Sequence, residues 1–338
     1  MPTDHEDEPA RRVNQGRAAS RKEPAVTPSP SASPLEASKS LSVESDRPYV
    51  WIDGELRPKS QATVSVFDHG FLYGDGCFEG IRVYRGVIFK CRSHLDRIYR
   101  NAAALRMEMP YSKDELTRIM EQCVEANELE DGYIRLIFSR GVGSLGLNPF
   151  ACPRPSVVVI ADQIRLYPEE MYQDGMRVIV AKRPRTPTAC LDPSLKSLNY
   201  LNSILAKIEA IDAGCLEAIM LSLDGHVGEC TGDNLFMVKD GVVYTSPLDV
   251  GMLDGITRSF VINEVAPACG VKAVEKRLRL DDVLNADEVF LTGSAAEIIA
   301  VTQVDDTRIS EGQGPVTEKL RNHFRAVVTG DADSIPVD

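Results

Sequence analysis

The sequence predicts an α+β fold built from two β-rich units. The dipeptides Asp53-Gly54 and Arg85-Gly86 stand between runs of alternating β-formers, and they indicate tight hairpins. Helical segments follow the strands without the regular alternation that a parallel, doubly wound sheet requires. With 338 residues, 43% of them hydrophobic, the chain has the length of about two domains. No internal repeat indicates a solenoid or a propeller instead.

The first unit is expected over residues 48–165. A disordered tail is predicted before it, at 1–47, because that stretch is rich in Ser, Pro and charge and has no aromatic residue. Besides the two hairpins, the unit carries one predicted helix at 93–107 and a second from Ser112 onward. Glu115 follows Ser112 by three residues, which is the spacing of a reciprocal capping box. Two extended runs complete the strands, at 132–140 and 155–161.

A linker is predicted at 166–174, a second unit at 175–330 and a flexible C-terminus at 331–338. In the second unit, apolar residues recur at helical spacing from Leu198 up to Gly214. The remaining elements alternate with turns that contain glycine or proline. Strands are predicted at 217–223, 233–238, 242–247 and 288–293, and helices at 257–270 and 315–328.

Composition excludes several classes of function. The formal net charge of -12 disfavours a nucleic-acid partner, because an acidic surface repels phosphate backbones. No apolar run approaches the roughly 20 residues that span a bilayer, so a soluble protein without a membrane partner is expected. The eight cysteines have neither metal-site nor disulfide-framework spacing, and the five histidines are scattered, so we expect no metal and a cytoplasmic location. Nucleophile-elbow, Walker and dinucleotide motifs are all missing from the sequence.

Lys196 is the first candidate for chemistry. It lies directly before the predicted helix, close to the apolar residues Leu195 and Leu198. A desolvated lysine amine has a lowered pKa and can form a Schiff base with a carbonyl compound. The alternative is an ordinary surface lysine at the start of a helix, which the local context alone favours.

Other candidates point to a bound anion. Glycine-containing turns that can hold one occur at 228–234, 253–259 and 292–297. In the second turn, Ile256 and Thr257 enter a helix with unpaired N–H groups, although Thr257 can also be a plain helix cap. Arg97, three residues after His94 on one helix face, is either a phosphate clamp or a solvated surface residue. Glu229 lies in a strand-like run, where a buried carboxylate needs a cationic partner.

Seven segments in chain order carry a family resemblance. They are VSVFDHGFLYGDGCFEGIRVY (64–84), SHLDR (93–97), GYIRLIFSRGVGSLGLNP (132–149), LKSLNYLNSILAKIEA (195–210), GECTGDNLF (228–236), LDGITR (253–258) and TGSAAEI (292–298). Together they resemble the fold-type-IV aminotransferases, which use pyridoxal 5'-phosphate. Within that family, the chain looks most like a branched-chain amino acid aminotransferase. The resemblance implies a small N-terminal α/β-sandwich-like domain and a larger C-terminal β-rich, pseudo-barrel domain.

The resemblance also implies roles around the cofactor. Lys196 matches the lysine that binds pyridoxal phosphate as a Schiff base and later moves the proton. Glu229 matches the carboxylate that pairs with the pyridine nitrogen, and Tyr200 matches the tyrosine beside the phenolic oxygen. The implied phosphate contacts are Arg97, Ile256, Thr257 and Ser294. At position 294, serine stands where threonine is common in the family, and it keeps the hydroxyl.

The implied reaction is ping-pong transfer of the amino group of L-leucine, L-isoleucine or L-valine to 2-oxoglutarate. Arg135 matches an arginine that receives the second carboxylate of glutamate. The matching side-chain pocket consists of Tyr73, Phe78, Tyr133, Leu145 and Leu147, and the backbone of Ala295 and Ala296 matches the α-carboxylate site. In the family, Tyr73 and the 143–148 loop reach the neighbouring subunit's pocket, so a homodimer or higher homo-oligomer is implied.

Three alternatives remain open. A D-amino acid aminotransferase shares the lysine, the glutamate and the phosphate contacts, although Phe78-Glu79-Gly80-Ile81-Arg82 favours the L-specific branch. Aminodeoxychorismate lyase uses the same cofactor to eliminate pyruvate, and the YIR and GDN segments disfavour it. A non-catalytic binding protein on the same fold is the remote alternative, because the Schiff-base lysine is present.

Overall fold

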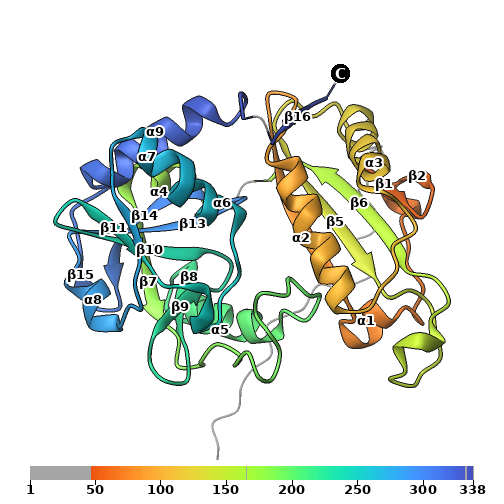
Figure 1. Ribbon diagram of the computed structural model, residues 1–338, viewed down its shortest axis with the longest axis horizontal. Coiled ribbons are helices and arrows are strands. Elements are labelled where there is room, and N and C mark those ends of the chain that lie inside the picture. The colour runs from red at the N-terminus through yellow and green to blue at the C-terminus, as the bar shows by residue number, and fades with distance from the viewer. Residues whose placement is uncertain (1–46, 165, 332, 338) are drawn as a thin grey trace, which may run out of the picture. The chain divides into compact units, whose positions relative to one another are not determined.

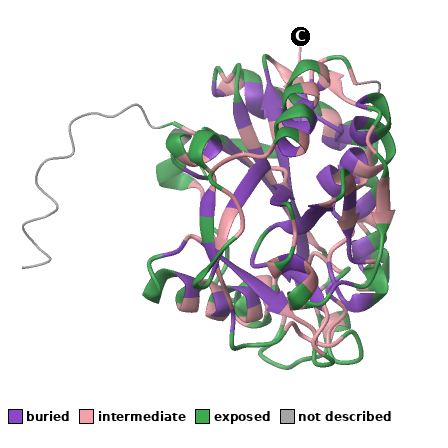
Figure 2. Cartoon of the chain, turned by 90° about the vertical axis from the view of Figure 1, so that its left-hand side faces the viewer, coloured by how far each residue is buried: buried purple, intermediate pink, exposed green. Residues whose placement is uncertain are grey.

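The computed structural model describes residues 47–164, 166–331 and 333–337. The predicted disordered tail therefore lies outside the described residues, apart from Arg47. Two β-sheets with helices packed against them make up the described chain (Figure 1). This mixture of strands and helices confirms the predicted α+β class. Figure 2 shows that the buried residues concentrate in the strands of both sheets, whereas the connecting loops are mostly exposed or half-buried.

The first sheet is antiparallel throughout. Its strands are β1 (Tyr49–Ile52), β2 (Glu55–Pro58), β3 (Gly76–Tyr84), β4 (Val87–Ile88), β5 (Gly132–Ser139), β6 (Ser156–Asp162) and β16 (Ile335–Pro336), in the spatial order β16-β4-β3-β5-β6-β1-β2. Both predicted hairpins are confirmed, because β1 pairs with β2 and β3 pairs with β4. Their turn residues Asp53-Gly54 and Arg85-Gly86 all have positive φ, as a type I′ turn requires.

Two helices cover one face of the first sheet, α2 (Cys91–Ala104) and α3 (Lys113–Ala126) (Figure 1). The predicted capping box of α3 is confirmed. Ser112 Oγ accepts from the N–H of Glu115 at 3.3 Å, and the Glu115 carboxylate accepts from the N–H of Ser112 at 2.7 Å. Beneath these helices lies an apolar core that includes Leu95, Ile98, Leu116, Met120, Ile134 and Phe138. The shorter elements of this half are α1 (His69–Tyr73) and the 3₁₀ turns Lys59–Gln61 and Pro149–Ala151.

Strand β16 lies within 331–338, the end that the sequence predicts to be flexible. Ile335 pairs with Ile88, and the N–H of Val337 donates to the carbonyl oxygen of Gly86 at 2.7 Å. Ile335 and Val337 also pack against the core of the first sheet. A two-residue strand carries no periodicity, and its partner is far away in the sequence, so no local pattern could predict it.

The second sheet is mixed. Its strands are β7 (Met176–Val180), β8 (Glu217–Leu221), β9 (Val227–Cys230), β10 (Asn234–Lys239), β11 (Val242–Thr245), β12 (Ala273–Glu275), β13 (Glu288–Gly293), β14 (Glu297–Val304) and β15 (Thr307–Arg308). The pairs β11–β12, β14–β7 and β7–β8 are parallel, and the others are antiparallel. Alternate residues of β10 enter two cores, Leu235 and Met237 one of them, Phe236 and Val238 the other. The sheet is thus buried on both faces here.

The helices of this half are α4 (Glu169–Asp174), α5 (Leu201–Asp212), α6 (Ile256–Phe260), α7 (Ala266–Ala268), α8 (Leu280–Leu284) and α9 (Pro315–Val327), with a 3₁₀ turn at Leu248–Val250. The helix predicted over 257–270 is interrupted, because a π-helical turn at Val261–Val265 separates α6 from α7. Helix α4 occupies most of the predicted linker 166–174. The two-domain division stays a prediction. Among the described helices, none combines the length and the apolar character needed to cross a membrane.

Helix α5 turns its apolar stripe outward. Leu201, Ile204, Ile208 and Ile211 are exposed, although their spacing correctly predicted a helix. The buried face of α5 instead consists of small residues, Ser203, Ala206 and Ala210, which lie over β8. The helix therefore packs closely on the sheet and leaves an apolar surface uncovered.

Candidate active site

A cavity of about 300 Å³ is lined by seven of the fifteen candidate site residues that the sequence analysis singled out. Phe78, Tyr133 and Arg135 enter it from β3 and β5 of the first sheet. Lys196, Tyr200, Ser294 and Ala295 line it from the second half of the chain. Its volume lies at the small end of the range typical of ligand pockets.

Lys196 lies on a segment that pairs with the first sheet. The N–H of Phe78 donates to the carbonyl oxygen of Lys196 at 2.9 Å, and the N–H of Leu198 donates to that of Gly76 at 2.9 Å. The lysine amine therefore projects beside β3. Lys196 Nζ is 3.1 Å from the hydroxyl of Tyr200 and 4.7 Å from the centre of the Phe78 ring. No carboxylate of the described residues forms an ion pair with it.

Glu229 is buried on β9, next to an arginine that the sequence analysis missed. Arg185 forms an ion pair with one carboxylate oxygen, and the other oxygen accepts from Asn234 Nδ2 and from the N–H of Leu253, both at 3.1 Å. Burial raises the pKa of Glu229, and the charges of Arg185 and Lys196 oppose that shift. Arg185 also donates to Ser203 Oγ at 2.8 Å. Glu229 thus has the cationic partner that the sequence analysis required of a buried carboxylate.

Arg97 is also buried, and it is held by a second carboxylate that the sequence analysis missed. Glu79 of β3 accepts from Arg97 Nε and Nη2, both at 2.7 Å, and from His94 Nδ1 at 2.7 Å. Arg97 Nη1 donates to the carbonyl oxygen of Asp254 at 2.6 Å. His94 and Arg97 lie on the same face of α2, and both therefore donate to the carboxylate of Glu79. A charged residue in the middle of an apolar strand was the signal for Glu79.

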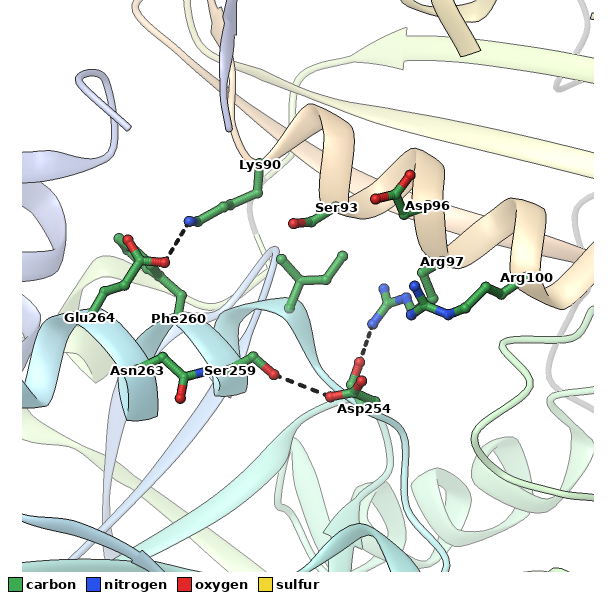
Figure 3. A pocket seen from close by; sticks show the side chains of 11 residues that line it. Lys90, Ser93, Asp96, Arg97, Arg100, Asp254, Ser259, Phe260, Asn263 and Glu264 are labelled. Carbon is green, nitrogen blue, oxygen red and sulfur yellow. Dashed lines mark hydrogen bonds and ion pairs between the residues drawn. The ribbon is translucent and has the colours of Figure 1, made fainter. Parts of the chain in front are cut away.

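A second cavity, of about 260 Å³, lies beside Arg97 (Figure 3). Arg97 and Arg100 line it from α2, and Asp254, Ile256 and Ser259 line it from the loop and the first turn of α6. Thr257 is buried next to Ile256. The Asp254 loop is packed closely against Asn234, because a Cβ at Gly255 would lie 1.9 Å from Asn234 Oδ1. The loop next to the candidate phosphate-binding residues Ile256 and Thr257 therefore packs against β10, the strand that follows Glu229 in the chain.

The predicted side-chain pocket is only partly assembled. Arg135 lies 4.5 Å above the Phe78 ring, and its Nη2 is 3.4 Å from the hydroxyl of Tyr133. Gly80 permits this arrangement, because a Cβ there would lie 1.7 Å from the Tyr133 hydroxyl. Ala295 lines the cavity, whereas Ala296 is buried in the core of the second half.

Three predicted pocket residues lie outside the cavity of their own chain. Tyr73, Leu145 and Leu147 are exposed by 38%, 67% and 79%. The hydroxyl of Tyr73 donates to the carbonyl oxygen of Leu145, and His69 Nε2 lies 2.7 Å from that of Ser144. Helix α1, which carries His69 and Tyr73, and the loop that carries Leu145 and Leu147 are therefore fixed to each other, while Tyr73, Leu145 and Leu147 remain exposed.

The cavity also contains ionisable residues that the sequence analysis did not single out. Lys207 forms an ion pair with Glu217 at 2.7 Å, and Glu217 also accepts from the N–H of Thr231 at 2.7 Å. Asp233 accepts from the hydroxyl of Tyr167 at 2.8 Å. Burial and the charge of Glu217 raise the pKa of Asp233 to about 7. Only the tertiary fold brings these residues together, so no local pattern indicated them.

Known proteins are similar to this chain in sequence and in fold. The model of the class IV amino-transferase family matches residues 76–304. A protein of Methanocaldococcus jannaschii, provisionally named a branched-chain-amino-acid aminotransferase, is 45% identical over 281 residues, which are 83% of this chain and 96% of that protein. A D-alanine aminotransferase of Listeria monocytogenes is 35% identical over 278 residues, 81% of this chain and 94% of its own.

A solved structure agrees over the same range. The branched-chain amino acid aminotransferase of Escherichia coli has a TM-score of 0.83 and 33% sequence identity, and the match covers 86% of this chain and 99% of that one. The matched family region runs from β3 to β14, and it includes every candidate cofactor residue that the structure gathers around Lys196 and Arg97. The chain belongs to the class IV aminotransferases, of fold type IV.

Proposed function

We propose that this enzyme transfers the amino group of L-leucine, L-isoleucine or L-valine to 2-oxoglutarate, with pyridoxal 5'-phosphate as cofactor. The observation that carries the proposal is the amine of Lys196, which lies beside the Tyr200 hydroxyl in a cavity lined by Phe78, Tyr133 and Arg135. The names of the Methanocaldococcus jannaschii relative and of the Escherichia coli structure support the same substrate class. A cytoplasmic location stays a prediction from the sequence.

The residues around Lys196 fit the chemistry of the cofactor. Its aldehyde requires an amine, and Lys196 Nζ has no ion-pair partner among the described residues. Its pyridine nitrogen requires a carboxylate, and Glu229 is buried and held in one orientation by Arg185, Asn234 and Leu253. Its phosphate requires hydrogen-bond donors, which Arg97, Thr257 and Ser294 contain. When bound, pyridoxal phosphate supplies an electron sink for the electrons that the departing α-proton leaves behind.

Lys196 is the base in this proposal. With the cofactor and an amino acid substrate bound, Lys196 Nζ would take the α-proton and later return it. Tyr200 holds the amine through the 3.1 Å contact between its hydroxyl and Nζ. The Tyr200 and Phe78 rings pack edge to face, with 5.0 Å between the ring centres, which restricts the position of the hydroxyl.

Phe78 and Tyr133 provide an apolar surface for a branched aliphatic side chain. Arg135 lies above the Phe78 ring, where its guanidinium can receive the second carboxylate of glutamate or 2-oxoglutarate. The backbone of Ala295 and Ala296 is the proposed site of the α-carboxylate. One cavity can thus accept both an apolar and an anionic substrate, as the two half-reactions require.

We propose that the enzyme works as a homodimer. Tyr73, Leu145 and Leu147 are predicted pocket residues, yet they are exposed and do not line the cavity of their own chain. Val64, Val66 and Phe67 in the segment before α1, and Phe71 in α1, are exposed as well. An exposed apolar surface of this kind is typical of a subunit interface. A second copy that covers these loops would complete both cavities.

Borohydride trapping followed by peptide mapping tests the cofactor assignment. We expect the reduced adduct on the peptide that contains Lys196. Lys207 provides an internal control, because it lines the same cavity but is paired with Glu217. An adduct on Lys207, or no adduct after incubation with pyridoxal phosphate, would contradict the proposal.

The substrate class is tested by half-reactions of the cofactor-loaded enzyme. L-leucine should convert the cofactor to its amine form, which changes its absorbance, whereas D-alanine should not. A faster reaction with D-alanine would assign the chain to the activity of its Listeria monocytogenes relative. Release of pyruvate from aminodeoxychorismate would assign it to the lyase instead.

A further inference from the structure

We propose that Glu79 is the residue that positions Arg97 for the phosphate of the cofactor. The inference rests on the proposed function, because it takes Arg97 to be a phosphate ligand. Glu79 itself does not line either cavity of the site. It acts through Arg97, so it is a positioning residue and not a catalytic one.

The contact between the two side chains has bidentate geometry. Arg97 Nε donates to one Glu79 oxygen and Nη2 to the other, each at 2.7 Å, so the guanidinium meets the carboxylate side-on. Glu79 is fully buried and Arg97 is 4% exposed. Two parallel hydrogen bonds between buried ionised groups restrict both the position and the rotation of the guanidinium.

A count of donors shows what remains for a ligand. A guanidinium has five N–H groups. Two of them reach Glu79, and one on Nη1 reaches the carbonyl oxygen of Asp254 at 2.6 Å. One N–H is left on each terminal nitrogen. Figure 3 shows the Arg97 guanidinium between α2 and the Asp254 loop, at the edge of the cavity that Ile256 also lines.

His94 fixes the carboxylate in turn. Burial would raise the pKa of Glu79, but the charge of Arg97 and the hydrogen bonds from Arg97 and His94 hold it well below its usual range. Burial lowers the pKa of His94. A neutral His94 therefore donates from Nδ1 to an ionised Glu79 at 2.7 Å. Glu79 and Arg97 together form a pair without net charge. Arg97 therefore contributes oriented hydrogen-bond donors to a phosphate rather than a net positive charge.

The alternative is that Glu79 has a purely structural role and does not position Arg97 for the phosphate. Glu79 lies on β3 and Arg97 on α2, so their pair also attaches the helix to the first sheet. Loss of such an attachment would lower the melting temperature without changing the preference for a phosphorylated ligand. The ratio of two dissociation constants distinguishes the roles, because instability that is unrelated to the phosphate cancels from it.

The experiment measures binding of pyridoxal 5'-phosphate and of pyridoxal to the apo-form of the full chain. Both ligands present the same aldehyde to Lys196, so the ratio of their dissociation constants reports the phosphate site alone. We expect Glu79→Gln to reduce the preference for pyridoxal phosphate by about tenfold to a hundredfold, because a glutamine offers only one acceptor to the Arg97 fork. An unchanged or increased preference overturns the proposal.

Glu288→Gln is the matched control. Glu288 is another buried carboxylate, and it accepts from the N–H groups of Val316 and Thr317, at the start of α9. Its replacement should lower stability and leave the ratio unchanged. A wild-type chain that binds both ligands equally refutes the proposed function, whereas a normal ratio in Glu79→Gln refutes only the role of Glu79.

Variants of His94 decide the question if Glu79→Gln does not fold. His94→Leu removes one of the three donors to Glu79, and His94→Asn keeps an N–H donor at this position. We expect His94→Leu to reduce the preference for the phosphorylated ligand by at least about threefold and His94→Asn to restore most of it. Equal ratios in both variants and in the wild type overturn the proposal.

Discussion

Replacing Arg185 with methionine should destabilise the apo-enzyme, because it removes the ion-pair partner of the buried carboxylate of Glu229. Glu229 is 5% exposed, and after the change it keeps only the neutral donors Asn234 Nδ2 and the N–H of Leu253. Removal of one partner from a buried ion pair costs about 3–5 kcal/mol. Methionine is unbranched and apolar and replaces the aliphatic stem of arginine, so loss of packing contributes only part of that figure.

The penalty should depend on pH in a defined direction. Burial already raises the pKa of Glu229 above its ordinary value while Arg185 is present, and removal of Arg185 raises the pKa further. A carboxyl group with a raised pKa in the folded state favours folding at low pH, and this contribution is lost as the pH rises through the folded-state pKa. The variant should therefore be most destabilised near pH 8.5 and approach the wild type as the pH falls towards 5.5.

Thermal unfolding of the two apo-proteins at several pH values provides the measurement. At pH 8.5 we expect an apparent melting temperature lower by on the order of 5–10 °C. The double variant Arg185→Met with Glu229→Gln should recover much of this loss, because its buried amide carries no charge. A deficit of the same size at pH 5.5 and pH 8.5 would refute this account of the pair.

Three further predictions follow from the cavity and its surroundings. Gly80→Ala places a Cβ 1.7 Å from the Tyr133 hydroxyl, so kcat/KM for L-leucine should fall about tenfold to a hundredfold in steady-state assays. Leu147→Asp puts a charge on a side chain that is 79% exposed in the single chain, and light scattering should detect a shift from dimer to monomer, since a buried unpaired charge costs several kcal/mol. Asp233→Asn should raise the melting temperature near pH 9 and have little effect near pH 5. Burial and the charge of Glu217 raise the pKa of Asp233 to about 7, so its ionised form is unfavourable in the folded state above that pH.

Each of these predictions has a control or a contradicting result. Gly312→Ala should be silent, because a Cβ added at that position would meet no atom within 4 Å beyond its chain neighbours. Unchanged kinetics in Gly80→Ala would show that Tyr133 moves without consequence. A Leu147→Asp protein that remains dimeric would place the subunit interface elsewhere. An Asp233→Asn protein whose stability gain is the same at both pH values would mean that Asp233 does not titrate between them.

Local features of the fold could be predicted from the sequence. The Asp53-Gly54 turn and the Ser112–Glu115 capping box depend on residues within a few positions of one another, and both are present. Periodicity found helix α5 but not the direction of its apolar face. That direction depends on the small residues Ala206 and Ala210 fitting against β8, which spacing does not encode.

The roles of the candidate site residues were predicted only where the family motifs contain them. Lys196 and Tyr200 are four positions apart, and the motif contains both. The pairs Glu79–Arg97 and Arg185–Glu229 each join separate elements, so only the tertiary structure reveals them. Glu79 and Arg185, the two missed partners, each neutralise the buried charge of a predicted site residue, Arg97 and Glu229 respectively. The requirement for such partners could be stated from the sequence, but their identity could not.

The backbone hydrogen bonds that join the Lys196 segment to β3 affect how the enzyme can move during turnover. A hinge motion that opened the cavity between the two sheets would break the contacts from Phe78 to Lys196 and from Leu198 to Gly76. The amine would then leave its place beside Tyr200. Turnover without that loss requires substrates to enter and products to leave past flexible side chains and loops, while the two sheets stay joined along this seam.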